Sequence, residues 1–118
     1  MARSRYKFKD NQYPYFMTCT ILHWLSVFSS PHIANIVIES LRFLQQENVK
    51  IYARVMLENH IHLIAQSENI SKDIARFKAF TAKKIIAYLT ERNAKTILDQ
   101  FKYYKKSYKG EDRKIQLW

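Results

Sequence analysis

The sequence predicts an α+β domain in which an antiparallel sheet carries its helices on one face. Three short segments, at 15–22, 50–57 and 60–66, predict strands from their apolar, aromatic and β-branched residues. Two longer stretches, beginning at Ser30 and Ser71, repeat apolar residues at helical spacing. The order of strand, helix, two strands and helix is that of split βαβ units, which build a ferredoxin-like antiparallel sheet.

The first strand and the first helix each follow from local sequence. The run YPYFMTCTIL predicts a strand over 15–22, which we expect to be buried on both faces. Ser30 is expected to cap the following helix, because its hydroxyl can accept a hydrogen bond from the first turn. Pro31 suits the first helical position, and the apolar spacing predicts an end near Asn48.

A hairpin and a second helix come next. The strands KIYARVML and HIHLIAQ are separated only by Glu58 and Asn59, which predicts a tight hairpin. Ser71 is expected to cap the second helix, with Asp73 in its first turn, where a carboxylate complements the helix dipole. The apolar face of this helix predicts core positions at Ile74, Phe77, Thr81, Ile85 and Tyr88.

The last part of the chain predicts a third helix and a final strand. Residues 95–108 place apolar side chains on one side and lysines on the other, and Gly110 is expected to end this helix. The closing sequence RKIQLW alternates polar and apolar residues and predicts a short strand that reaches Trp118. No linker, repeat or low-complexity segment interrupts the chain, so residues 1–118 are expected to form a single domain.

The net charge of +10 is concentrated at the two ends of the chain. Residues 1–10 carry +3, residues 11–70 carry −1, and residues 71–118 carry +8. Such polarisation suits a polyanionic partner, because lysine and arginine side chains that neutralise phosphates release condensed counterions. A solvated, lysine-rich surface without a partner is the alternative.

The single cysteine and the distribution of apolar residues indicate where in the cell the protein is expected. Cys19 is the only cysteine and cannot form an internal disulfide, and the first residues, MARSRYKFKDNQYPYF, lack the apolar core of a signal peptide. No apolar run approaches the roughly 20 residues of a membrane span. The sequence therefore predicts a cytoplasmic protein with no membrane partner.

Two of the four histidines stand one residue apart in the stretch ENHIHLI. Successive side chains of a strand point to opposite faces, so His60 and His62 share a face. Ile61 and Leu63 then point the other way, into the core. Same-face neighbours lie about 6–7 Å apart, which suits two imidazoles on one metal ion that has a further ligand. Spacing alone leaves open both a metal site and a pair of half-exposed histidines without a ligand.

The stretch YARVMLENHIHLIAQS resembles the signature of the single-tyrosine HUH transposases, in particular the REP-associated tyrosine transposase group. In this family a strand ending in Met-x-Asn-His-hydrophobic-His-Leu carries two metal-binding histidines. The resemblance extends to YFMTCTILHWLSVF, SKDIARFKAFTAKKII and IQLW, so it covers nearly the whole chain. Glu58 stands where the family usually has proline, in a turn where we expect the difference to have little effect.

The resemblance implies a ferredoxin-like enzyme that cleaves and rejoins single-stranded DNA, often at hairpin-forming ends. His60 and His62, with a polar third ligand, are implied to hold Mg²⁺ or Mn²⁺ against the scissile phosphate. A tyrosine hydroxyl is implied to attack, giving a 5′-phosphotyrosine link and a free 3′-OH. In the family this tyrosine lies in a Tyr-x-x-x-Asn helix that follows the Trp-Gln strand. The nucleophile and the third ligand are therefore expected after Trp118, and the chain is expected to be a truncated domain.

Basic residues at both ends of the chain are the candidates for DNA contact. Lys72, Arg76 and Lys83 fall within about 40° of each other on the second helix, opposite its apolar face, and predict phosphate contacts. Arg3 and Arg5 alternate with aromatic residues in an N-terminal arm. For this arm, contact with a single strand and a solubilising tail are equally open.

Most other aromatic residues are expected to be structural. Tyr88, Tyr104 and Tyr108 lie on apolar helix faces, whereas Tyr103 falls off such a face and is the least implausible substitute nucleophile. Trp24 is expected to pack within a loop rather than to form a stacking platform.

Two rival functions remain open at the level of sequence. The first is a catalytically inactive, nucleic-acid-binding ferredoxin-like module, which the absence of an RRM-type aromatic strand motif disfavours. The second is a scaffold protein whose basic charge serves no ligand. The leading prediction is a cytoplasmic, nucleoid-associated DNA endonuclease and transposase domain that binds single-stranded or hairpin DNA, with homodimer formation left open.

Overall fold

The computed structural model describes residues 13–105 and 116–118 of the chain. Their elements are β1 (Tyr15–Thr20), η1 (Leu22–Trp24), η2 (Val27–Ser29), α1 (Pro31–Gln46), β2 (Lys50–Met56), β3 (His60–Gln66), α2 (Ile70–Glu91) and α3 (Lys95–Tyr103). The two η segments are short 3-10 helices. The predicted α+β class is confirmed.

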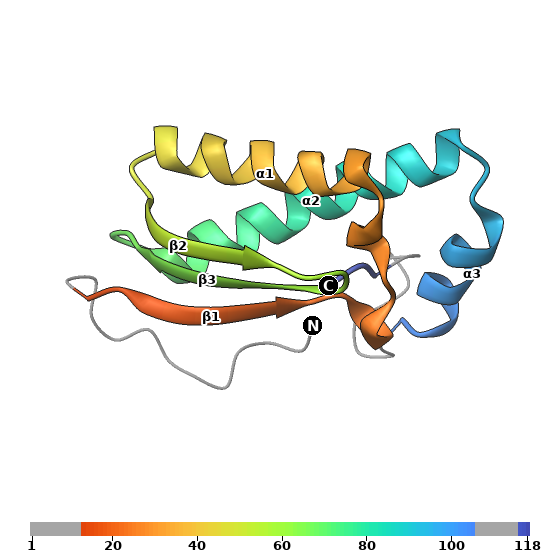
Figure 1. Cartoon of the computed structure of the whole chain (residues 1–118), viewed down its shortest axis with the longest axis horizontal. Coiled ribbons are helices and arrows are strands. Elements are labelled where there is room, and N and C mark those ends of the chain that lie inside the picture. The colour runs from red at the N-terminus through yellow and green to blue at the C-terminus, as the bar shows by residue number, and fades with distance from the viewer. Residues whose placement is uncertain (1–12, 106–115) are drawn as a thin grey trace.

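The three described strands form one antiparallel sheet in the order β1-β3-β2 (Figure 1). β2 and β3 form the predicted hairpin, in which the N–H of Leu57 donates to the carbonyl of His60 over 2.8 Å. β1 pairs with the other side of β3 and places Thr18 opposite His62. The strand that carries both histidines is therefore the central strand of this sheet.

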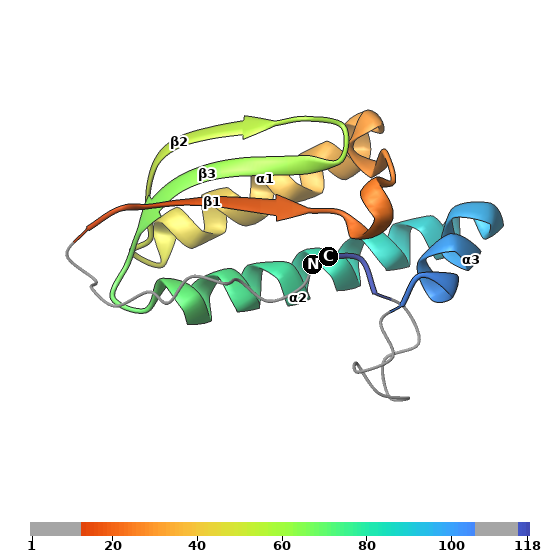
Figure 2. The same ribbon diagram turned by 90° about the horizontal axis from the view of Figure 1, so that it is seen from below.

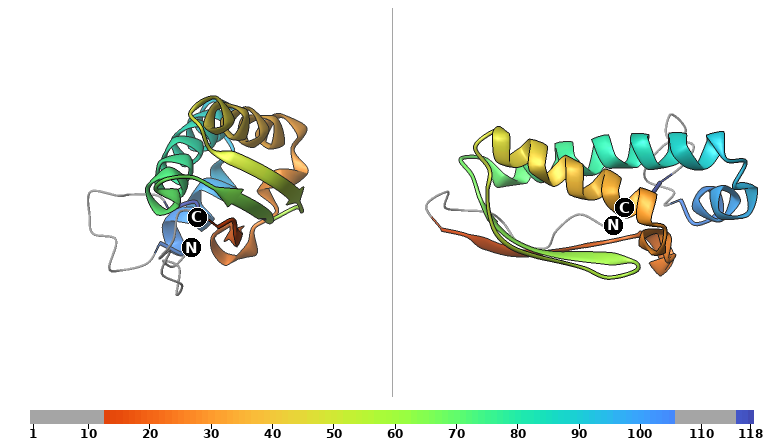
Figure 3. Two further views of the ribbon diagram at one scale, coloured as in Figure 1. Left: turned by 90° about the vertical axis from the view of Figure 1, so that its left-hand side faces the viewer. Right: turned by 45° about the horizontal axis from the view of Figure 1, so that its top comes forward.

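The two long helices, α1 and α2, lie on one face of the sheet (Figure 1, Figure 3). Ile61, Leu63 and Ala65 of β3 are buried on that side, whereas the residues that alternate with them are half-buried. No helix within the described ranges covers the opposite face. The histidines consequently lie on a sheet surface that none of the described helices covers. None of the described helices is both long and apolar enough to cross a membrane.

The prediction that the first strand is buried on both faces is wrong. Met17 and Cys19 are buried, but Phe16 and Thr18, which alternate with them, are exposed. A sheet with a single helical layer buries one face only, and the composition of the strand does not distinguish the two arrangements. Burial raises the pKa of the Cys19 thiol, because the thiolate would lose its hydration.

One helix cap agrees with its prediction and one does not. The Ser30 hydroxyl accepts a hydrogen bond from the first turn of α1 over 3.4 Å, which confirms that cap. α2 begins at Ile70, and the side-chain oxygen of Asn69 accepts a hydrogen bond from its first turn. Ser71 therefore lies inside the helix, and its prediction as the cap is wrong. Asparagine and serine both cap well, and the burial of Ile70 in the core favours the earlier start.

The first long helix ends close to its predicted position, and the third helix ends earlier than predicted. α1 ends at Gln46, near the predicted end at Asn48, whose φ of 70° is left-handed and cannot continue a helix. α3 ends at Tyr103 rather than at 108. The predicted positions of Tyr108 and Gly110 lie outside the described residues.

The predicted last strand is not found in residues 116–118, and its first residues, 113–115, lie outside the described ranges. Leu117 and Trp118 are instead buried beside α2 (Figure 2). The N–H of Leu22 donates to the carbonyl of Leu117 over 2.7 Å. A fourth strand is thus not among the described residues, and the sheet establishes an antiparallel α+β arrangement without the complete ferredoxin-like topology.

Candidate functional site

His60 and His62 lie side by side on the open face of the central strand. Their ring centroids are 4.7 Å apart, and the rings meet edge to face at 79°. Both side chains are half-buried, while Ile61 between them is fully buried and anchors the strand against the helices. The two-residue period of the strand brings the imidazoles together as the sequence predicts.

Each imidazole is held through its Nδ1 atom. Nδ1 of His62 lies 3.0 Å from the hydroxyl of Thr18 on β1, and Nδ1 of His60 lies 2.7 Å from the side-chain oxygen of Asn59. The amide nitrogen of Asn59 donates to the carbonyl of Trp24 over 3.2 Å, which turns the amide oxygen toward His60. Because that oxygen can only accept, the contact favours the tautomer of a neutral His60 ring that carries its proton on Nδ1, with the lone pair on Nε2.

The Nε2 atoms of both histidines make no hydrogen bond within the described part of the chain. Histidines that bind metals are usually oriented in this way, since a second hydrogen bond on the other ring nitrogen fixes the tautomer and the ring plane. Two imidazole nitrogens therefore fit as two ligands of one divalent ion. Of the two ions expected, Mn²⁺ suits nitrogen better, because Mg²⁺ is the harder cation and prefers oxygen.

The pair does not complete a metal site by itself. Among residues 13–105 and 116–118, no three histidine, cysteine, aspartate or glutamate side chains come together. His23 and His32 are both exposed and stack on Tyr104 and Tyr88 respectively. A metal ion held by this pair would need a third ligand from another residue type, from water, or from outside the described ranges.

The turn after β1 contributes to the site in a way that the sequence does not reveal. His23 and Trp24 both have φ near 55°, the left-handed region that costs about 1–2 kcal/mol for residues other than glycine. The N–H of Trp24 donates to the carbonyl of Ile21, and His23 stacks on Tyr104 with centroids 3.7 Å apart. These contacts hold the Trp24 carbonyl against Asn59. The Trp24 side chain is 74% exposed, so its prediction as loop packing is wrong.

The predicted basic stripe lies away from the histidines. Lys72, Arg76 and Lys83 are all exposed on α2, opposite the helix face that packs on the sheet. The histidines lie on the face of the sheet opposite α2, so the structure does not bring the stripe and the pair together. Arg76 also forms ion pairs with Asp73 and Glu47, at 3.6 and 3.8 Å, which reduces its availability to phosphate. Arg3 and Arg5 lie outside the described residues.

None of the described helix tyrosines has a contact with the histidine pair. Tyr88 and Tyr104 are half-buried against the core, close to their predicted positions. Tyr103 is exposed and meets only the ring of Tyr104 among its described ring contacts. The geometry therefore gives Tyr103 no support as a nucleophile.

Replacing Asn59 tests the orientation of His60. Asn59→Ala is expected to weaken Mn²⁺ binding by about 10-fold to 100-fold, because the His60 ring loses the acceptor that fixes its tautomer. Asn35→Ala, at an exposed position of α1, is the control and should leave the affinity unchanged. The measurement is the Kd for Mn²⁺ from titration calorimetry. Equal affinities in the two variants would show that Asn59 has no such role.

Comparison with known proteins adds no identification. No protein-family model matches the sequence, and no curated protein matches it either.

Proposed function

We propose that this chain is the metal-binding domain of a single-tyrosine HUH transposase, an enzyme that cleaves and rejoins single-stranded DNA at hairpin-forming ends. The observation that carries this proposal is the orientation of His60 and His62. Each ring has its polar contact at Nδ1, on the sheet face that no described helix covers, and neither Nε2 atom is hydrogen-bonded to a described residue.

The sheet also supports the ferredoxin-like part of the proposal. A β-α-β-β-α-β domain of this type places its first and second strands on either side of the third, and the order β1-β3-β2 has this arrangement. Both long helices cover one face (Figure 3). The complete β-α-β-β-α-β topology is part of this proposal.

The roles of the residues follow from their positions. A divalent ion bound by His60 and His62 would offset negative charge that develops on the phosphoryl oxygens. Thr18 and Asn59 keep the two rings oriented, and the buried residues behind β3 hold the strand in place. The open face leaves room for a DNA strand to reach the ion from the side opposite the helices.

The nucleophile is proposed to be a tyrosine on a helix that follows Trp118, as the resemblance implies. Its hydroxyl would attack the phosphorus, so that the DNA is joined to the tyrosine through its 5′-phosphate and the 3′-oxygen leaves as a hydroxyl. Because the phosphotyrosine ester keeps the energy of the cleaved phosphodiester bond, the DNA can be rejoined without another energy source. The half-buried Tyr88 and Tyr104 do not compete for this role.

Covalent capture tests the function. A protein expressed from the whole reading frame that contains this sequence should form an SDS-resistant adduct with a single-stranded DNA hairpin in Mn²⁺. Residues 1–118 alone should bind the hairpin, more weakly as salt increases, and form no adduct. Absence of an adduct from the longer protein would contradict the enzyme. An adduct on Tyr103 in residues 1–118 would contradict the assigned nucleophile.

A binding module without catalysis is the second candidate. It is favoured by one observation, the aromatic side chains that the sheet exposes on the histidine face. Such a module would bind single strands with no dependence on Mn²⁺, which separates it from the transposase.

A further inference from the structure

The open face of the sheet exposes large apolar side chains. Phe16 of β1 is 65% exposed, and Tyr52 and Val55 of β2 are 57% and 56% exposed. The solvent face of an antiparallel sheet is ordinarily polar, because nothing covers it. A group of apolar side chains on such a face is typical of a surface that binds a ligand.

The aromatic rings are continuous with the histidine pair. Phe16 stacks on His62, with ring centroids 5.4 Å apart and planes 23° from parallel, and His62 meets His60 edge to face. The other face of the Phe16 ring remains open to solvent, as its exposure requires. A planar group placed on Phe16 would therefore extend a row of rings that ends at the two candidate metal ligands.

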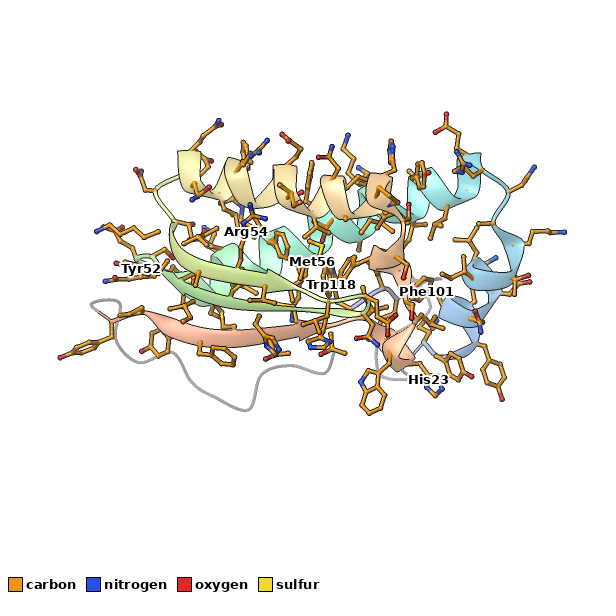
Figure 4. The ribbon with its side chains drawn as sticks, in the orientation of Figure 1. His23, Tyr52, Arg54, Met56, Phe101 and Trp118 are labelled. Carbon is orange, nitrogen blue, oxygen red and sulfur yellow. The ribbon has the colours of Figure 1, made fainter. Side chains whose placement is uncertain are left out.

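Tyr52 marks the far end of the same surface. Its hydroxyl donates to the side-chain oxygen of Gln66 over 2.8 Å, and Gln66 lies on the same face of β3 as the histidines. Figure 4 shows Tyr52 and His23 toward opposite ends of the sheet, with Arg54 and Met56 on the helix side of β2. At about 3.3 Å per residue, the distance along β3 from Gln66 to His60 is roughly 20 Å. The surface is long enough for several nucleotides.

The charge of this face suits a nucleic acid. None of the strands β1, β2 and β3 contains an aspartate or glutamate, so no carboxylate of these strands would repel a phosphate. Lys50 lies opposite Gln66 at the Tyr52 end and adds a positive charge to the strands. Exposed aromatic rings beside a cationic side chain, without competing carboxylates, suit the binding of unpaired bases.

We propose that Phe16 and Tyr52 stack on the unpaired bases of a DNA strand that crosses the sheet toward His60 and His62. This inference rests on the proposed function, because single-stranded DNA is its substrate. A duplex is not the ligand, since its bases already stack on each other and hide their faces from protein rings. Stacking also tolerates any base, so this surface holds the strand while other contacts select the cleavage site.

Substitution of Phe16 tests the stacking surface. Phe16→Ala should weaken binding of a single-stranded DNA oligonucleotide by about 10-fold or more at constant salt, because one base loses its stacking partner. Phe16→Trp should restore the affinity. Phe43→Ala is the matched control, since Phe43 is 52% exposed on α1, on the helix layer, and its loss should change nothing. Fluorescence anisotropy measures the Kd, and melting curves verify that each variant is folded.

An oligonucleotide with abasic sites separates stacking from other effects. The unsubstituted protein and Phe16→Ala should bind it equally, since no base remains to stack. The proposal is overturned if Phe16→Ala binds the normal strand as tightly as the unsubstituted protein does, or loses the same affinity for the abasic strand. It is also overturned if the effect of Phe16→Ala appears only with RNA.

The same measurements distinguish this inference from the proposed function. If His60→Ala with His62→Ala leaves Mn²⁺ binding unchanged while Phe16→Ala still weakens DNA binding, the metal site fails and the stacking surface stands. If Mn²⁺ binding depends on the histidines but Phe16→Ala has no effect on DNA, the stacking surface fails alone.

Discussion

Replacing both His60 and His62 by alanine is expected to abolish the stabilisation that Mn²⁺ gives this protein. An ion that binds only the folded state stabilises it by about 2.7 kcal/mol when its concentration is 100 times the Kd. For a domain of this size that free energy raises the melting temperature by roughly 10 °C. The double variant lacks both Nε2 atoms, so the melting temperature should no longer respond to Mn²⁺.

The control for this experiment is His32→Ala. His32 is exposed on α1, where it stacks on Tyr88 and has no ring contact with His60 or His62. Its loss should therefore leave the response to Mn²⁺ intact. Differential scanning fluorimetry over a series of Mn²⁺ concentrations gives the measurement. An unchanged shift in the double variant would show that the histidines are not ligands and would remove the main support for the proposed function.

Trp118→Ala is expected to destabilise the protein by about 3–5 kcal/mol, the usual cost of removing a buried large aromatic side chain. Trp118 is 6% exposed, and its ring packs between Phe28 and Phe77 at centroid distances of 5.7 and 5.9 Å. Its indole N–H donates to the hydroxyl of Thr81 over 3.0 Å. The substitution leaves a cavity where the C-terminal residues, α2 and the turn before α1 meet.

Two further variants show which contact matters. Trp118→Phe keeps an aromatic ring but loses the hydrogen bond, and should cost less, because Thr81 still donates to the carbonyl of Phe77 over 2.8 Å. Trp24→Ala is the matched control, since this tryptophan is exposed and its loss should change stability by no more than about 0.5 kcal/mol. Urea unfolding measures all three. A loss below about 1 kcal/mol for Trp118→Ala would mean that the C-terminal residues do not belong to the core.

The candidate site shows how far sequence reasoning reaches. The shared face of His60 and His62 depends on the two-residue period of a strand and needs only the sequence. Thr18 is 44 residues away from His62 and becomes its partner through the pairing of β1 with β3. No local pattern marks Thr18 as part of the site, since threonine is common in strands for other reasons.

In the fold, too, local features agree with their predictions and features that depend on distant segments do not. The cap at Ser30 and the hairpin at Glu58 and Asn59 are local features and are found where predicted. The expected burial of β1 on both faces and the strand ending at Trp118 depend on which layers and partners meet, and both differ in the described structure. The sequence shows that a residue is apolar, but it does not show which other part of the chain will bury that residue.

The order of strand, helix, two strands and helix, the excess of positive charge and the shared face of the two histidines can all be predicted from the amino-acid sequence. Each of these features depends on residue type or on the spacing of residues within a single helix or strand. Three properties become visible only in the folded chain: no described helix covers the histidines, Thr18 and Asn59 orient them, and the basic stripe of α2 faces away from them. These properties arise from contacts between distant segments, whose free energies no local pattern encodes.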